Sequence, residues 1–361
     1  MKKLKLKKPK LSIPSSKLLK RSPSVEERVS DAISNVPRIT NDTVAEHRED
    51  VLSGARKYIY PLQHSKHSVV RISVSLFIIV IVGFFVICGL SLYKFQSTSG
   101  FIYGVTKIVP FPVAKVGPRW VSYESYLFEL RRNMHYYATQ QQANFSTKDG
   151  KAQLIRLKEQ AMNQAIQNAL VNELAGKNKI SVSGQDVNNQ LILVRSENRL
   201  GSSDSVFKQV LSQYWGWSES DFKRELSQQL LQQSVVAKLD TATTSKASQV
   251  LKQLRSGADF ATQASQNSQD LLTKNNGGQY PNPITLNDQQ ISPIISHALF
   301  KLSPGQISGV VNTGFTLEIL KVMDKSGNSL HGSHIQFNLQ DVTKYTQPLE
   351  TKQHVHRYIK V

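Results

Sequence analysis

The sequence predicts an α+β protein with a single transmembrane helix, an all-α domain and an antiparallel sheet packed with helices. Three observations predict this fold class. One apolar stretch is long enough to cross a bilayer, the region from about 119 to 240 repeats helix-start signals, and the region after Ser245 combines helical periodicity with two strand-like runs. A chain of 361 residues has room for more than one domain of roughly 150 residues.

The membrane segment lies between Ile72 and Tyr93, where 22 residues carry no charge. As a helix this stretch reaches about 33 Å, which matches a bilayer core of roughly 30 Å. Because about seventy mostly polar residues precede it, it resembles an uncleaved signal anchor more than a cleaved signal peptide. We therefore predict a transmembrane signal anchor over residues 67–95.

The segment before the anchor is basic. Residues 1–71 contain 16 Lys and Arg residues against 7 Asp and Glu residues, which predicts a cytoplasmic N-terminus and extracytoplasmic C-terminal domains in a single-pass protein of the cell membrane. Residues 1–66 read as a basic, mostly disordered cytoplasmic tail with a short helix around Val44 to Tyr60. The basic run MKKLKLKKPK has no interleaved aromatic residues, so no nucleic-acid partner is expected and the lipid bilayer is its predicted contact.

Several function classes are excluded by composition and motif. The chain has one cysteine, Cys88, so it has neither a disulfide framework nor a cysteine-based zinc site. It contains no nucleophile elbow, Walker loop or H-E-x-x-H motif, and no cofactor is predicted. The whole chain has a formal net charge of +19.

Three serines mark helix starts in the region 109–240. Ser122, Ser183 and Ser218 are each flanked by an apolar pair that can form a hydrophobic staple, and Gly176 and Gly216 stand where C′ glycines are expected. The faces of these helices are rich in Gln, Asn and Ser. A set of larger side chains can cradle unfolded polypeptide or, alternatively, pack in the core: Met134, Tyr136, Tyr137, Tyr214 and Trp215.

Two stretches of this region carry a resemblance. PFPVAKVGPRWVSYESYLFELRR, followed by a long helix and then by YWGWSESDFKRELSQQLL, resembles the N-terminal domain of SurA-type and PrsA- or PpiD-type exported foldases. The resemblance implies a helical chaperone domain over residues 109–240.

The following region resembles a second family. The words LRSGADFATQAS, NSQDLLTKNNGGQY, ISPIISHALFKLSPGQISGVVNT and FTLEILKV follow one another in the order of a parvulin-type (PpiC) peptidyl-prolyl isomerase domain. The resemblance implies such a domain over residues 245–341, with a C-terminal segment at 342–361 whose return onto the helical domain is left open.

The order of strands departs from that family. Parvulin domains begin with a strand that carries a His-Ile pair, but here only TATT precedes the first helix. The matching motif is instead found near the C-terminus, at Ser333, His334 and Ile335. We interpret this as a circular permutation, in which strand 332–339 pairs with strand 315–323 through a short hairpin. The second active-site histidine of many parvulins is replaced by Glu318.

The resemblance also implies the site residues. His334 and Asp270 would form the catalytic polar centre with Ser268 beside it, and Ile291, Ile295 and Phe300 would line the substrate slot for the proline ring. Rotation about an X-Pro bond has to break amide resonance, with a general amide barrier of about 18 to 20 kcal/mol, and needs no metal. Read without the resemblance, the three apolar residues are the core face of one helix and Asp270 is a loop cap.

The sequence thus predicts a membrane-anchored extracytoplasmic foldase that is a peptidyl-prolyl cis-trans isomerase and a chaperone. Its predicted partners are unfolded or exported polypeptides with X-Pro bonds. A non-catalytic holdase that binds unfolded polypeptide is the first alternative. A metal-binding ectodomain is a minor one, because the last 31 residues contain His331, His334, His354 and His356.

Overall fold

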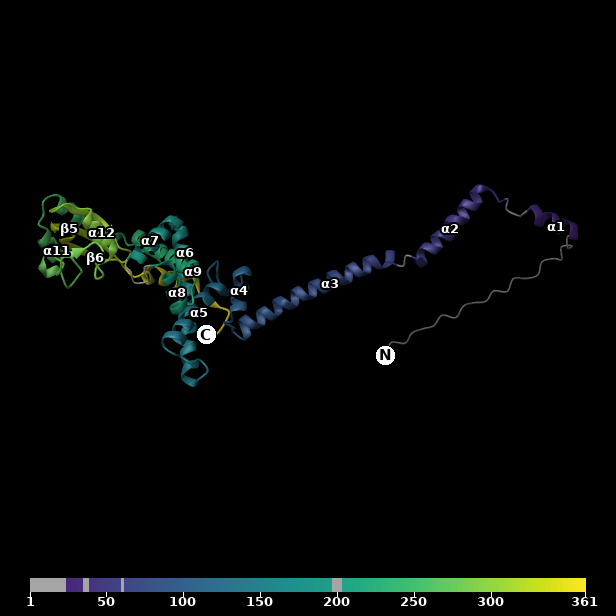
Figure 1. Ribbon diagram of the computed structural model, residues 1–361, viewed down its shortest axis with the longest axis horizontal. Coiled ribbons are helices and arrows are strands. Elements are labelled where there is room, and N and C mark those ends of the chain that lie inside the picture. The colour runs from purple at the N-terminus through teal and green to yellow at the C-terminus, as the bar shows by residue number, and fades with distance from the viewer. Residues whose placement is uncertain (1–23, 35–38, 60–61, 197–202) are drawn as a thin grey trace. The chain divides into compact units, whose positions relative to one another are not determined.

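The computed structural model describes residues 24–34, 39–59, 62–196 and 203–361 (Figure 1). The contacts within the chain divide it into two units, residues 1–84 and 85–361. Each unit is described by itself.

The first unit contains α1 (Val25–Ser34), α2 (Asn41–Ile59) and most of α3 (Leu62–Gly89). We expected mostly disorder with one short helix here, whereas the described residues are almost all helical. Local interactions account for α2: Thr40 Oγ1 accepts from Thr43 N, and Thr43 Oγ1 accepts from Thr40 N, so the two threonines cap its first turn. Val25 and Val44 are exposed, and none of the residues of α1 and α2 whose burial is described is buried.

The apolar stretch is helical throughout. Ser68–Lys94 forms 27 residues of helix with a mean hydropathy of 2.9 in its most apolar window, and only 6% of that window is buried. This helix is long and apolar enough to cross a membrane, and it is the one such helix among the described residues.

The second unit begins with the end of α3 and a π-helical turn η1 (Leu90–Lys94), followed by a bundle of helices. Tyr123 and Tyr126 are buried at the centre of the bundle's main core. The helices are α4 (Gly100–Ile108), α5 (Tyr123–Gln140), α6 (Lys148–Lys177), α7 (Gly184–Ser196), α8 (Asp204–Trp215) and α9 (Glu219–Leu239).

The predicted helix starts are present. Ser122 Oγ accepts from Ser125 N at α5, and Ser183 and Ser218 form reciprocal capping boxes with Asp186 and Asp221 at α7 and α9. Gly216 ends α8 in the left-handed conformation with φ 65°, as expected. The expectation that Gly176 follows the end of its helix is wrong, because α6 continues through it to Lys177, and the C-cap residue is Asn178.

A three-stranded sheet corrects the expectation of an all-α domain. β1 (Pro112–Val116) lies between β2 (Arg119–Ser122) and β7 (His356–Arg357), and both pairings are antiparallel. These strands are too short to show a clear alternation in the sequence, and β7 comes from the other end of the chain. The C-terminal segment does return as a helix, since α13 (Thr343–Gln353) contacts α6, and Ile359 enters the core of the bundle.

The remaining residues form a four-stranded antiparallel sheet in the order β3-β6-β5-β4, seen in the green and yellow part of Figure 1. The strands are β3 (Ile284–Thr285), β4 (Ile307–Asn312), β5 (Thr316–Ser326) and β6 (Ser329–Asn338). The helices between and before them are α10 (Thr241–Arg255), α11 (Phe260–Asn267), η2 (Lys274–Asn276) and α12 (Pro293–Phe300).

The two faces of this sheet have separate cores. Ile319 and Ile335 pack with α10 and α11 on one face, and Leu320 and Val322 pack with α12 on the other. The strand pairing predicted for the C-terminal hairpin is present, because β5 and β6 pair from Thr316↔Asn338 to Ser326↔Ser329 around Gly327. Since side chains alternate between faces, His334, which pairs with Leu320, points to the α12 face.

Candidate functional site

His334 is the centre of a buried polar cluster. Its Nε2 lies 3.0 Å from Asp270 Oδ2 and 2.8 Å from Thr273 Oγ1. The Thr273 hydroxyl donates to Asp270 Oδ2 at 2.5 Å, so this hydroxyl is left to accept a hydrogen bond from Nε2. The structure therefore brings together two of the residues that the sequence predicts, His334 and Asp270, across 64 positions of the chain.

The other ring nitrogen of His334 faces a second carboxylate. Glu318 Oε2 lies 3.0 Å from Nδ1, and Glu318 Oε1 accepts from Thr316 Oγ1 at 2.7 Å. Glu318 is 1% exposed and His334 is 4% exposed. The imidazole is thus held between two acidic side chains, which fixes its orientation in the protein interior.

Asp270 is the most accessible member of the cluster. Its side chain is 19% exposed. Burial alone would raise its pKa, but hydrogen bonds from Thr273 Oγ1 and Leu272 N, together with His334, outweigh that effect and the pKa lies below its usual value. Asp270 is accordingly ionised at neutral pH, with part of its carboxylate open to a ligand.

Backbone contacts hold the acidic loop on the histidine strand. His334 N donates to Gly278 O at 2.8 Å, and Gln279 pairs with Ser333 as an isolated bridge. Gly278 has φ +78°, and a Cβ at this position would lie 2.2 Å from His334 O. Only glycine permits this close approach.

The aromatic ring of Tyr280 covers the imidazole. The two rings are stacked with centroids 4.4 Å apart. Tyr280 also packs against the apolar cluster that Leu320 and Val322 form with α12. Its hydroxyl is buried without a hydrogen-bond partner, and burial raises its pKa. Tyr280 therefore joins the polar cluster to the apolar one.

Ser268 supports the loop rather than the imidazole. Its Oγ accepts from Gln336 N at 3.2 Å and from Asp270 N at 3.4 Å. Ser268 is 3% exposed, so the hydroxyl lies inside the fold. It positions Asp270 relative to β6.

Two of the predicted slot residues, Ile295 and Phe300, lie on α12 and Ile291 just precedes it, in the cluster on the same face of the sheet as His334. Ile295 is buried in the core with Leu299, while Ile291 and Phe300 are half-buried at its margin. Ile291 precedes Pro293, so the three residues are not all on one helix. Ile295 is a core residue, and Ile291 and Phe300 are the two that retain accessible apolar surface.

Sequence reasoning missed other residues of the cluster. Thr273 and Tyr280 contact His334 directly. Leu271 and Leu272, which follow Asp270 in the chain, were also missed, and their side chains are 80% and 92% exposed. The Asp-x-x-Thr spacing within a loop was the one available signal for Thr273. Nothing in the local sequence marks Tyr280.

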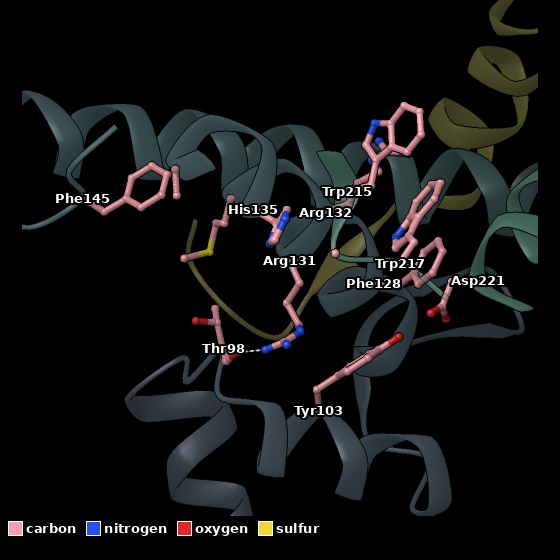
Figure 2. A pocket seen from close by; sticks show the side chains of 13 residues that line it. Thr98, Tyr103, Phe128, Arg131, Arg132, His135, Phe145, Trp215, Trp217 and Asp221 are labelled. Atoms are coloured by element: carbon pink, nitrogen blue, oxygen red, sulfur yellow. Dashed lines mark hydrogen bonds between the residues drawn. The ribbon is translucent and has the colours of Figure 1, made fainter. Parts of the chain in front are cut away.

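A cavity lies in the helical part of the second unit (Figure 2). It has a volume of about 370 Å³ and is lined by aromatic and cationic side chains. Phe128 and Trp217 are stacked with centroids 5.3 Å apart, and the guanidinium of Arg131 lies 5.2 Å from the Tyr103 ring centroid and donates to Thr98 O, as Figure 2 shows. Such a lining can bind extended polypeptide through apolar and cation–π contacts.

The residues predicted to cradle polypeptide fall into two groups. Met134 and Trp215 line this cavity. Tyr137 instead packs on the main core with Tyr136 against its ring, and Tyr214 is exposed outside the cavity lining.

The histidines of the last 31 residues do not gather around a metal. Among the described residues, no group of three or more His, Cys, Asp or Glu side chains has the geometry to hold a metal ion. His331 Nδ1 lies 2.8 Å from Asp324 Oδ1, and His356 packs on Tyr358. The metal-binding alternative is therefore not supported.

Two family models match consecutive parts of the chain. Residues 62–236 match the SurA-like N-terminal domain, and residues 230–324 match the PPIC-type PPIASE domain. The chain matches the SurA/PrsA-type foldases. The SurA-like domain contains the aromatic cavity. The PPIC-type match includes Asp270, Tyr280 and Glu318 but ends before β6 and His334.

Two curated relatives are Foldase protein PrsA 2 of Bacillus cereus, 27% identical, and Foldase protein PrsA 2 of Bacillus anthracis, 28% identical. Each alignment covers 41% of this chain and 55% of the relative, so the chain spans about half the length of the curated relatives it matches. The crystal structure of a peptidylprolyl isomerase (PrsA) from Bacillus anthracis is 20% identical, covers 53% of this chain and 86% of that chain, and superposes with a TM-score of 0.17.

Proposed function

We propose that this chain is a membrane-anchored, extracytoplasmic foldase that isomerises X-Pro bonds and binds unfolded polypeptides. The observation that carries the proposal is the cluster of His334, Asp270 and Thr273, in which a buried imidazole holds a partly exposed carboxylate. The exposed Leu271 and Leu272 follow this carboxylate in the chain. The match to a PPIC-type domain gives this cluster its chemical context.

The permuted strand order is part of the proposal. The PPIC-type match begins within α9 and ends at Asp324, so β6, the strand that carries the His-Ile motif, lies outside it. β6 pairs with β5 on one side and β3 on the other, which supports β6 as the counterpart of the first strand of the family. The hairpin at Gly327 is the connection that a permutation of antiparallel neighbours requires.

The chemistry follows from the geometry. Amide rotation passes through a twisted state in which the charge-separated planar form is lost. A carboxylate near the peptide carbonyl oxygen disfavours the planar form more than the twisted one, because the planar form places more negative charge on that oxygen. Asp270 is the group that can make this contact, and the buried His334 acts as its positioning residue.

Apolar surface for the substrate is present next to Asp270 in the chain and at the margin of the α12 cluster. The half-buried Ile291 and Phe300 offer a surface for the proline ring, and the exposed Leu271 and Leu272 can contact residues that flank the proline. Burying an apolar side chain contributes about 25 cal/mol per Å², which supplies binding without specificity for one sequence.

The anchor and its orientation rest on the sequence and on α3. The helix Ser68–Lys94 has the length and hydropathy of a membrane span, and the excess of positive charge before it supports a cytoplasmic N-terminus. The SurA-like and PPIC-type domains then lie outside the cytoplasm, where exported polypeptides emerge unfolded.

A proline-limited refolding assay on the full chain in detergent or lipid nanodiscs tests the proposal. Wild type is expected to accelerate the slow phase, and His334→Ala is expected to lose at least tenfold, which corresponds to about 1.4 kcal/mol. His331→Ala is the matched control, because His331 pairs with Asp324 at the exposed end of the same hairpin. Equal rates with wild type and with buffer would contradict the enzyme proposal.

A non-catalytic holdase is the second candidate. The aromatic cavity of the SurA-like domain favours it, because this cavity can bind polypeptide without any contribution from His334. Suppression of client aggregation without acceleration of refolding is the result that would select the holdase.

A further inference from the structure

Helix α4 presents an apolar stripe to the outside of the fold. Ile102 and Thr106 are buried against the helix bundle, while Phe101 is 71% exposed and Ile108 is 85% exposed. Residues seven apart lie on the same face of a helix, so the two large apolar side chains form one line, with Gly104 and Val105 between them. No described residue covers Phe101 or Ile108.

The stripe is tied to the end of the apolar helix. Leu92 of η1 and Ile102 of α4 are buried in the same core. Only residues 95–99 separate η1 from α4, a connection that reaches at most about 20 Å, and Gln96 within it has φ 47°. Leu90 at the start of η1 and Phe95 just after it are also exposed apolar side chains.

The chain segment that contains the stripe carries charge of one sign. From Val51 to Tyr123 the sequence contains no Asp or Glu, although it contains several Lys and Arg residues. Lys94 lies over the ring of Phe95 and Lys107 over the ring of Tyr103, so the cations are placed beside the apolar surface. Glu124 and Asp221 reach the side of the helix at Lys107 and Ile108 from outside this segment, and Glu124 is paired there with Arg224. An apolar stripe bordered by the cations Lys94 and Lys107 fits an anionic lipid headgroup region.

We propose that α4 lies on the outer surface of the bilayer that holds the preceding helix, with Phe101 and Ile108 inserted between the lipids and Lys94 and Lys107 at the headgroups. This inference rests on the proposed membrane anchor. It gives the anchor a second contact, which fixes the SurA-like domain at the membrane surface instead of leaving it on a free tether.

Spin-label accessibility on the full chain in nanodiscs of phosphatidylglycerol and phosphatidylcholine tests this proposal. In a Cys88→Ser background, single labels are introduced by Ile108→Cys, by Val80→Cys within the apolar helix and by Lys252→Cys at an exposed site on α10. Lipid-inserted labels meet oxygen more often than a water-soluble nickel chelate. The expected result is a several-fold higher oxygen-to-nickel ratio at position 108 than at position 252.

The label at position 80 separates the two claims. A lipid-exposed label at 80 with an aqueous label at 108 would overturn the α4 proposal and leave the anchor intact. An aqueous label at 80 would overturn both. Adding Lys94→Gln and Lys107→Gln is expected to raise nickel accessibility at 108 several-fold in the anionic nanodiscs, and an unchanged ratio would contradict the role of the two cations.

Discussion

Glu318 Oε2 lies 3.0 Å from His334 Nδ1, in a pair that is almost completely buried and joins β5 to β6. By resemblance this position is that of a second histidine, so a carboxylate here changes what the central imidazole can do. Because Asp270 faces the other ring nitrogen, the ring is oriented from both sides.

Glu318→Gln is expected to reduce isomerase activity moderately, because the amide keeps a group beside Nδ1 that can either donate or accept a hydrogen bond. Glu318→Leu is expected to reduce it more and to destabilise the fold by about 3 to 5 kcal/mol, the usual effect of removing one partner of a buried pair. Refolding kinetics and denaturant unfolding measure the two effects. Unchanged stability and activity in Glu318→Leu would show that the pair has no role.

Gly278→Ala is expected to displace the acidic loop from His334, since its Cβ would meet the His334 carbonyl at 2.2 Å. Gly257→Ala is the matched control: Gly257 also has positive φ, at +95°, but its Cβ would meet nothing within 4 Å. The control should lose about 1 to 2 kcal/mol from backbone strain alone. Gly278→Ala should lose clearly more, as measured by denaturant unfolding, together with its isomerase activity. Equal losses in the two variants would contradict this account.

Local patterns in the sequence were sufficient for some features and insufficient for others. Ser218 and Asp221 stand three apart and cap a helix through their own backbone, so the sequence alone predicts the capping box. The hairpin of β5 and β6 was also predictable, because its alternation and its glycine turn are local.

The contacts that complete the site are not local. Thr273 and Tyr280 approach His334 because η2, the glycine loop and β6 meet in space, and no spacing along the chain encodes that meeting. The sheet of β1, β2 and β7 was not predicted for the same reason, since β7 joins it from the far end of the chain. Ile295 was placed in the substrate slot by resemblance, but packing puts it in the core.

Glu129 on α5 predicts a pH dependence of stability. The pKa of the Glu129 carboxyl is raised to about 7, because burial and the neighbouring Glu225 raise it more than Arg132 lowers it. Arg132 Nη2 lies 2.9 Å from Glu129 Oε2, but the two groups are not aligned for a hydrogen bond. Since the folded pKa exceeds the ordinary value of 4.5, the neutral carboxyl is favoured in the folded state. The contribution of Glu129 to stability is therefore greatest below about pH 4.5 and is lost as the pH rises through about 7.

Glu129→Gln should remove this fall and should stabilise the domain by up to about 3 kcal/mol at pH 8, with little effect at pH 4. Unfolding free energies measured from pH 4 to pH 8 check the slope. Glu219→Gln, at an exposed position paired with Lys223, is the control and should keep the wild-type slope. An unaltered slope in Glu129→Gln would assign the pH dependence to other groups.

Trp215→Ala is expected to weaken suppression of client aggregation, because it removes an aromatic wall of the cavity in the SurA-like domain. Isomerase activity on a short X-Pro peptide should be unchanged, since that reaction uses the other domain. Tyr214→Ala, at an exposed neighbour outside the cavity lining, is the control. Equal suppression by the two variants would place polypeptide binding elsewhere.

The central claim is that the imidazole on β6 acts through the carboxylate of the acidic loop. A double-mutant cycle on isomerase activity, with His334→Ala, Asp270→Ala and the two combined, tests this coupling most directly. The account predicts that the double variant loses no more activity than the more impaired single variant, because the two residues act as one unit. The coupling would be contradicted if the fold-losses of the two single variants multiplied in the double variant, or if His334→Ala were fully active.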